Sequence, residues 1–241
     1  MCDAGRAWHD EGAVISPLVR AGALVAVAPA AALGCAGDEA RAGDFDDPDV
    51  PAAALNPDGV PYPTDRIGAR ARAGGLPGER LPNFSFQGYP GGDRAAGLRT
   101  LSLADYFDPE QRRHKLLDIQ VAAVWCTICA SEAEATVSVA DALAREGVVF
   151  LQVIVNGRVA AEGPSLDDFH LWLDEHELPY AAAIDVRARR LAGVGVGTVP
   201  WDILVDTRTM EILDSSAGAP VDVVDYVRSA LRWVEANPPS Y

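Results

Sequence analysis

The chain has 241 residues, of which 49% are hydrophobic and 23% are charged, and its formal net charge at pH 7 is −15. This length and composition predict one globular domain with additional terminal segments. The acidic balance argues against a nucleic-acid partner, because phosphate binding requires clustered lysine and arginine side chains. The four cysteines, Cys2, Cys35, Cys126 and Cys129, are too few for a disulfide-stapled scaffold, and no histidine pair has the spacing of a zinc site. We therefore expect neither a metal nor a cofactor.

The N-terminal segment has the features of an export signal. Residues 21–34 form an uncharged apolar run after Arg20, which suits a signal peptide and is short for a membrane span. The run ends in Ala-Leu-Gly before Cys35 and resembles a bacterial lipobox. We therefore expect residues 1–35 to be a signal peptide with a lipobox-like end, and Cys35 to be the lipid attachment that holds the protein to the membrane. Cleavage without lipidation and a buried cytosolic helix are the alternatives.

Residues 36–81 differ in composition from the rest of the chain. They are rich in Gly, Asp, Pro and Ala, and acidic residues gather near their start. With few large apolar residues, such a segment buries too little surface to fold alone. We expect a disordered or irregular acidic tether. A docking segment for a partner is the alternative.

From residue 82 to residue 241 the pattern alternates between strands and helices. Residues 83–86 and 100–103 alternate apolar and polar, as two short edge strands would. Residues 116–125 form an apolar strand, and an alanine-rich helix follows Cys126 and stops at Gly147.

The second half of the domain continues this order. Its expected elements are a central strand at 148–155, a helix capped by Ser165, a strand at 180–185, a hairpin of 201–205 with 210–213, and a closing helix with apolar residues at 223, 227, 231 and 234. The order β-α-β-α-β-β-α predicts an α/β fold with a mixed central sheet flanked by helices and extended by the N-terminal edge strands.

The Cys-x-x-Cys motif falls where the first long strand passes into its helix. Cys126 ends the strand, so its sulfur is expected at the helix N-terminus, where free N–H groups and the helix dipole stabilise a thiolate. Cys129 falls within the first turn. A Trp before the first cysteine, a strand before it and a helix after it make a redox motif more specific than Cys-x-x-Cys alone.

This domain resembles the TlpA-like, or redoxin-type, branch of the thioredoxin superfamily, whose members are bacterial proteins tethered to the membrane and facing the extracytoplasmic space. The motifs that carry the resemblance are Trp125-Cys126-Thr127-Ile128-Cys129 with Glu132, the segment from Phe169 to Asp185, and Thr198-Val199-Pro200 before the hairpin.

The resemblance implies a thioredoxin fold and a thiol–disulfide oxidoreductase. Cys126 is then the nucleophile and Cys129 the resolving cysteine, while Trp125 and the loop of Val199 and a cis Pro200 bind the substrate chain. The implied partners are protein thiols or disulfides and a membrane or periplasmic electron donor or acceptor.

One position departs from the family pattern. Gln120 stands where many thioredoxins have a buried carboxylate that relays the proton of the resolving thiol. Glu132 could replace this carboxylate as a proton relay, or it could be a solvated helix residue.

Two other functions compete with disulfide exchange. A peroxidase of the peroxiredoxin type usually has Thr three residues before its cysteine, where this chain has Ala123. A binding scaffold or metal chaperone would use the fold without catalysis, but the cysteine spacing differs from that of copper-carrying relatives.

Overall fold

The computed structural model describes residues 54–64, 72–73, 77–160 and 162–238. Residues 1–53, with the expected signal peptide and Cys35, lie outside this part. No helix within the described ranges is both long and apolar enough to cross a membrane.

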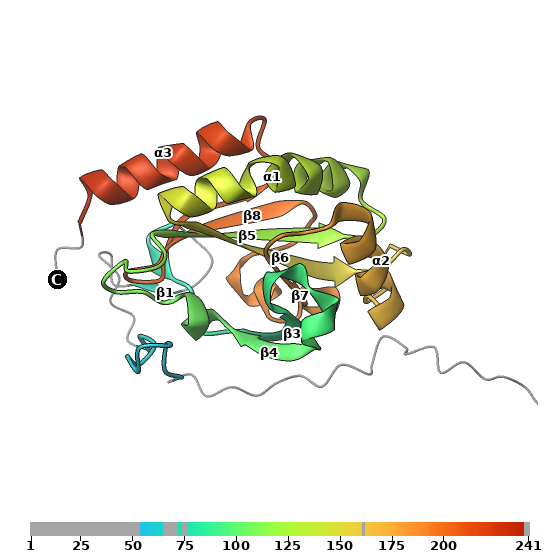
Figure 1. Cartoon of the computed structure of the whole chain (residues 1–241), viewed down its shortest axis with the longest axis horizontal. Helices are drawn as coiled ribbons and strands as arrows, with labels where there is room; N and C mark the ends of the chain where they lie inside the picture. The colour runs from blue at the N-terminus through green and yellow to red at the C-terminus, as the bar shows by residue number, and fades with distance from the viewer. Residues whose placement is uncertain (1–53, 65–71, 74–76, 161, 239–241) are drawn as a thin grey trace, which may run out of the picture. The chain divides into compact units, whose positions relative to one another are not determined.

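One mixed sheet organises the domain (Figure 1). Among the described residues its nine strands are β1 (Arg72–Ala73), β2 (Glu79–Arg80), β3 (Ser85–Tyr89), β4 (Arg99–Ser102), β5 (Leu116–Ala123), β6 (Val148–Asn156), β7 (Ala181–Ile184), β8 (Trp201–Asp206) and β9 (Glu211–Ala217). Their spatial order is β1-β2-β9-β8-β5-β6-β7-β3-β4. Strands β5, β6 and β7 are parallel, and β8, β9, β3 and β4 add antiparallel pairs on the two sides.

The element order agrees with the sequence prediction from β5 to the C-terminus. The expectation of two edge strands is half right. Strand β4 lies at the edge, but β3 pairs with both β4 and β7 and is internal. The reason is that the parallel strand β7 offers a free side to β3, which alternation of side chains within β3 does not reveal.

Three α-helices pack on one face of the sheet. They are α1 (Thr127–Glu146), α2 (Leu166–His176) and α3 (Val223–Ala236), and α1 and α3 lie side by side above β5 and β8 (Figure 1). Helix α1 ends at Gly147, which adopts φ 98° in the left-handed region. Helix α2 starts with the capping box of Ser165 and Asp168. Since both parallel crossovers, β5-α1-β6 and β6-α2-β7, run in the same direction, they place α1 and α2 on the same face.

The other face is covered by short 3-10 turns and by irregular chain. Tyr62 is buried there, and its hydroxyl donates to the carbonyl of Leu81 at 2.6 Å. The buried side-chain amide of Asn56 donates to the carbonyl of Phe107 at 3.0 Å. Within the described part of the segment 36–81, residues 54–64 are irregular chain packed on the domain, whereas β1 and β2 join the central sheet beside β9.

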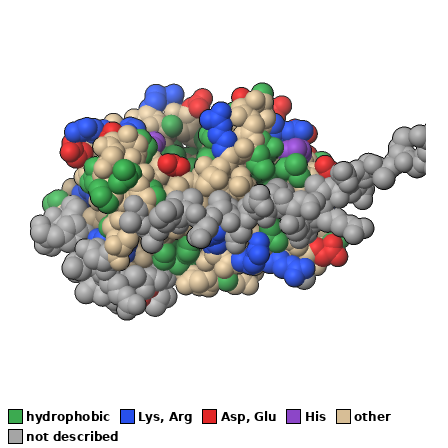
Figure 2. Space-filling view, turned by 90° about the horizontal axis from the view of Figure 1, so that it is seen from below, with side chains coloured by type: hydrophobic (Ala, Val, Ile, Leu, Met, Phe, Trp, Pro, Cys, Tyr) green, Lys and Arg blue, Asp and Glu red, His purple; other side chains and the backbone are tan. Residues whose placement is uncertain are grey.

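Charges of both signs share the surface seen from below the view of Figure 1. Figure 2 shows Lys and Arg side chains interspersed with Asp and Glu side chains on this face. Exposed ion pairs such as Arg94 with Asp174, at 2.7 Å, are typical of this arrangement. Such a mixed surface supports solubility.

Candidate active site

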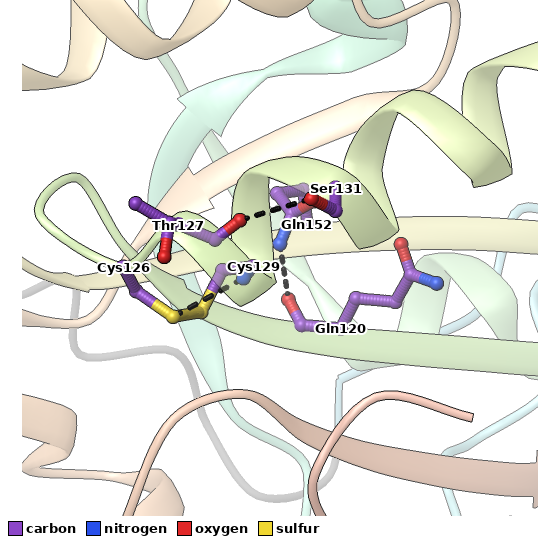
Figure 3. The surroundings of a disulfide bond; sticks show 6 residues. All are labelled: Gln120, Cys126, Thr127, Cys129, Ser131 and Gln152. Carbon is purple, nitrogen blue, oxygen red and sulfur yellow. Dashed lines mark hydrogen bonds between the residues drawn. A yellow bond between two sulfur atoms is a disulfide. The ribbon is translucent and has the colours of Figure 1, made fainter. Parts of the chain in front are cut away.

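A disulfide joins Cys126 to Cys129 where β5 passes into α1 (Figure 3). The two Cα atoms are 5.2 Å apart. Cys126 is the N-cap of α1, and its sulfur accepts a hydrogen bond from the backbone N–H of Cys129 at 3.1 Å. The sulfur that the sequence predicts to be the nucleophile therefore occupies the positive end of the helix dipole.

The two cysteines are buried, whereas two of their neighbours in the motif are exposed to solvent. Cys129 is 1% exposed and Cys126 is 5% exposed, whereas the neighbouring Trp125 and Ile128 are 44% and 60% exposed. Large apolar side chains in water beside a buried disulfide suit contact with another protein. The sequence analysis expects Trp125 to contact the substrate chain, and Ile128 is a second exposed apolar side chain beside the disulfide.

The loop before β8 reaches the same end of the sheet. Trp201 pairs with Val121 in the antiparallel register of β8 with β5, so Val199 and Pro200 follow the direction of β5 toward Cys126. The peptide bond between Val199 and Pro200 is cis, as the sequence analysis expects. Pro200 is buried and Val199 is half-buried.

The side chain of Gln120 is held by α1. Its Nε2 donates to Oγ1 of Thr136 on α1 at 2.9 Å. Figure 3 shows the second bond, in which Nε2 of Gln152 on β6 donates to the backbone carbonyl of Gln120 at 2.8 Å. A neutral amide thus fills the position of the usual carboxylate and joins sheet to helix. Gln120 has no ionisable proton to exchange with Cys129.

Three carboxyl groups lie near Gln120, on strands β5 and β8 and on helix α1. Glu132 is on the buried side of α1, three residues after Cys129 and so on the same helix face. Asp202 lies opposite Gln120 in the register of β8 with β5, and Asp118 is two residues before Gln120, so both side chains point toward α1. All three side chains are buried, which excludes the alternative of a solvated Glu132.

The carboxyl groups of Glu132 and Asp202 lie close enough to affect each other's pKa. A hydrogen bond between them requires a proton on one of the two, because two ionised carboxylates have no hydrogen to share. Burial raises the pKa of Asp202 to about 11, helped by the charges of Asp118 and Glu132. Burial also raises the pKa of Asp118, and that of Glu132, where the hydrogen bond from Asp202 works in the opposite direction.

A groove connects Glu132 to the surface. It has a volume of about 440 Å³ and runs between α1 and the loop that joins β9 to α3. Ile128, Glu132, Pro220 and Val221 are among its lining residues. Glu132 lines this groove and Asp202 does not, so Glu132 is the one of the two acids that is nearer to solvent.

Asp118 and Asp202 were missed by the sequence analysis. The available signal was a single acidic residue inside each of two apolar strands, in the sequences LLDIQV and WDILV. A buried strand with an unpaired acid is unusual enough to mark a functional position. No group of three or more His, Cys, Asp or Glu within the described ranges is arranged to hold a metal ion.

No protein-family model and no curated protein matches this sequence. Solved structures resemble it. A hypothetical protein from Sinorhizobium meliloti gives a TM-score of 0.52 at 15% identity, covering 67% of this chain and 85% of that chain. AhpC from Enterococcus faecalis gives 0.51 at 14% identity, covering 70% and 98%. The thioredoxin domain of a thiol-disulfide oxidoreductase from Bacteroides vulgatus gives 0.49 at 15% identity, covering 66% and 98%.

These likenesses concern the fold. Taken with the strand order, the three helices and the disulfide at the start of α1, they show that this chain has the thioredoxin fold, as the sequence predicts.

Proposed function

We propose that this protein is an extracytoplasmic thiol–disulfide oxidoreductase of the TlpA-like kind, which exchanges disulfides with partner proteins. The observation that carries the proposal is the disulfide of Cys126 with Cys129 at the N-terminus of α1 in a thioredoxin fold. When a reductant opens a disulfide at a helix N-terminus, the helix stabilises the negative charge of the thiolate that forms on the first sulfur.

The reaction has two exchange steps. In the reduced protein the Cys126 thiolate attacks a disulfide of the partner and forms a mixed disulfide, releasing one partner thiolate. The Cys129 thiol then loses its proton and attacks the Cys126 sulfur. The products are the Cys126–Cys129 disulfide and the second partner thiolate. The reverse sequence oxidises a partner dithiol.

Glu132 is the proposed proton relay for the second step. It lies one helical turn beyond Cys129 on the same face of α1, and it lines the groove to the solvent. Its carboxylate would accept the proton of the Cys129 thiol before attack and release it to water. This assignment gives the protein the base that Gln120 does not supply.

The proposed substrate surface surrounds the disulfide. Trp125 and Ile128 supply exposed apolar area on one side, and the loop of Val199 and Pro200 supplies backbone groups on the other. Backbone pairing with an extended partner segment gives affinity with little sequence preference. This suits an enzyme that acts on several partners.

The proposed location depends on residues outside the described part of the chain. With Cys35 lipidated, the mature protein begins at this residue, is anchored in the membrane and receives or donates electrons through a membrane or periplasmic partner. Mature protein would then enter the detergent phase on phase separation, and Cys35→Ala would release it. An intact Met1 on soluble cellular protein would contradict the anchor.

Insulin reduction tests the proposed activity. With dithiothreitol as electron donor, the wild-type protein should accelerate precipitation of the insulin B chain, and Cys126→Ser should abolish the acceleration. Cys129→Ser should instead accumulate covalent complexes with partner proteins in cells, because the mixed disulfide is not resolved. If neither variant differs from the wild type in these two measurements, the disulfide is structural and the fold serves as a binding scaffold.

A further inference from the structure

The inference concerns Asp202 and rests on the proposed function. Asp202 lies two residues after Pro200, at the start of β8, and its carboxyl group is 1% exposed. Neither of its oxygens accepts a hydrogen bond from any described residue, and the neighbouring ionisable group is the carboxyl group of Glu132. We propose that Asp202 is a positioning residue for the resolving step, whose protonated carboxyl group donates a hydrogen bond to Glu132 and keeps Glu132 ionised as the base for Cys129.

The geometry decides which of the two carboxyl groups holds the proton. Asp202 lies opposite Gln120 beneath α1 and does not line the groove. Glu132 lines the groove and is the member of the pair nearer to solvent. Ionisation costs less free energy at the group nearer to water, so the proton stays on Asp202 and the charge on Glu132.

The groups around Asp202 and Glu132 favour a single negative charge on the two carboxyl groups together. The other titratable groups around this pair come from four further places in the fold. Asp118 on β5 and Asp214 on β9 act on Asp202, and Tyr180 before β7 interacts with Glu132. Tyr226 on α3 interacts with Asp118 and Asp214. Tyr226 donates to Asp214 at 2.6 Å, and burial raises the pKa of both tyrosines. Among the residues that the structure describes, no lysine, arginine or histidine acts on Asp202 or Glu132. Without a cation, a second negative charge in the pair is strongly unfavourable.

The proton transfers balance within this arrangement. The Glu132 carboxylate takes the proton of the Cys129 thiol, and the Cys129 sulfur then bonds to the Cys126 sulfur while the bond to the partner sulfur breaks. The partner leaves as a thiolate. Glu132 is then neutral beside the neutral Asp202, and it returns its proton to water through the groove. Asp202 keeps its own proton throughout and ends in its starting state.

A chromogenic disulfide measures the resolving step without a protein partner. The reduced protein is mixed rapidly with one equivalent of a symmetrical nitrobenzoate disulfide, whose thiolate product is coloured. Attack by Cys126 releases the first coloured thiolate, and attack by Cys129 on the mixed disulfide releases the second. The rate of the second release is followed from acidic to mildly alkaline pH.

Three variants distinguish the roles. Glu132→Gln should slow the second release at neutral pH by about 100-fold, the low end of the effect of a general base. Asp202→Ala removes the donor to a charged group, so the acidic midpoint of the profile should rise by about one to two pH units. Asp202→Asn keeps an N–H donor in the same place and should retain the wild-type midpoint.

Asp118→Asn is the matched control, because burial raises the pKa of Asp118 and favours its neutral form, so the substitution changes a buried carboxyl group of the same cluster without removing a charge or the hydrogen bond to Glu132. Its midpoint should stay at the wild-type value. The proposal is wrong if Asp202→Ala keeps the wild-type profile, if Asp202→Asn behaves like Glu132→Gln, or if Asp118→Asn moves the midpoint as far as Asp202→Ala. If Asp202→Ala does not fold, the Asp202→Asn and Glu132→Gln profiles still decide between these outcomes.

The assay also separates this inference from the proposed function. Two-phase release with the pH profile described, together with failure to reduce insulin, would refute the protein-disulfide activity and leave the role of Asp202 intact. Insulin reduction with identical profiles for all variants would refute the role of Asp202 alone.

Discussion

The two ends of strand β8 carry buried aspartates in opposite circumstances. Asp206, at the end far from the disulfide, accepts hydrogen bonds from the Arg208 guanidinium, at 2.9 Å from Nε and 2.6 Å from Nη2. Asp202, at the end near the disulfide, interacts with Glu132, and no cation within the described ranges of the chain acts on it. Both side chains lie on the same face of the same strand, four residues apart.

The difference shows how a buried acidic side chain that stabilises the fold can be told from one that serves the active site. A buried carboxylate that serves the fold alone has a cation or backbone N–H groups to hold its charge, as Asp206 has. Asp202 costs the fold free energy, because it is desolvated without such partners. A buried acid without such partners, close to the disulfide of the proposed active site, is where we expect proton chemistry. Four predictions, in order of decreasing effect, test this contrast.

Arg208→Ala should give the largest loss of stability. The substitution leaves Asp206 as a buried charge without its cation, which costs about 3–5 kcal/mol of the free energy of unfolding. Urea unfolding of the oxidised protein measures the loss. The pH profile of the resolving step should not move, because Arg208 is at the other end of β8. A loss below about 1 kcal/mol would show that the Asp206 end is not held by its ion pair.

Asp202→Asn should reduce the dependence of stability on pH. The pKa of Asp202 is raised to about 11 in the folded protein, compared with about 3.9 unfolded. The folded state then binds the extra proton, so this contribution is complete below pH ~4 and is lost as pH rises toward the folded pKa. The slope is up to about 1.4 kcal/mol per pH unit, so between pH 5 and pH 8 the wild type should lose roughly 2–4 kcal/mol more than Asp202→Asn.

Urea unfolding of both oxidised proteins at the two pH values measures this difference, and Asp174→Asn on the exposed surface is the control. Equal slopes for wild type and Asp202→Asn would mean that Asp202 is ionised in the folded protein, contrary to the account.

Thr136→Val should have an intermediate effect on stability and none on proton transfer. Oγ1 of Thr136 accepts from Nε2 of Gln120 at 2.9 Å, so the substitution leaves a buried donor without its acceptor and costs about 1–3 kcal/mol. Thermal unfolding measures the cost. A shifted midpoint of the resolving step in this variant would transfer the proton relay from the carboxyl groups to the amide network.

Arg94→Ala should give the smallest effect. Its ion pair with Asp174 is exposed, with side chains 43% and 63% accessible, and such pairs contribute about 0–1 kcal/mol. Urea unfolding of this variant shows how much the loss of an exposed charge alone changes the free energy of unfolding. A loss as large as that of Arg208→Ala would remove the distinction between buried and exposed pairs on which the comparison depends.

The sequence was sufficient to predict the scaffold and the position of the two cysteines at the start of α1. Periodicity gave the order of strands and helices from β5 onward, because each of these elements carries a long apolar pattern. The Trp125-Cys126 motif and Val199-Pro200 marked the two loops that meet at one end of the sheet. Local patterns of this kind are visible along the chain.

The sequence was not sufficient for the carboxyl cluster. Asp118, Glu132 and Asp202 are far apart in the chain and meet only through the register of β8 with β5 and the packing of α1 on the sheet. Register is a property of strand pairing, and a single sequence does not define it beyond the hydrophobic pattern. For the same reason the position of β3 between β4 and β7 was not foreseen.

The reduction potential of the Cys126–Cys129 pair tests the central claim most directly. The protein is equilibrated at pH 7 in redox buffers of graded potential, and the reduced fraction is read by alkylation and mass. The account predicts a reversible two-electron transition between roughly −300 and −100 mV, the range of thiol–disulfide oxidoreductases. A pair that stays oxidised below about −300 mV would be a structural disulfide, and it would contradict the account.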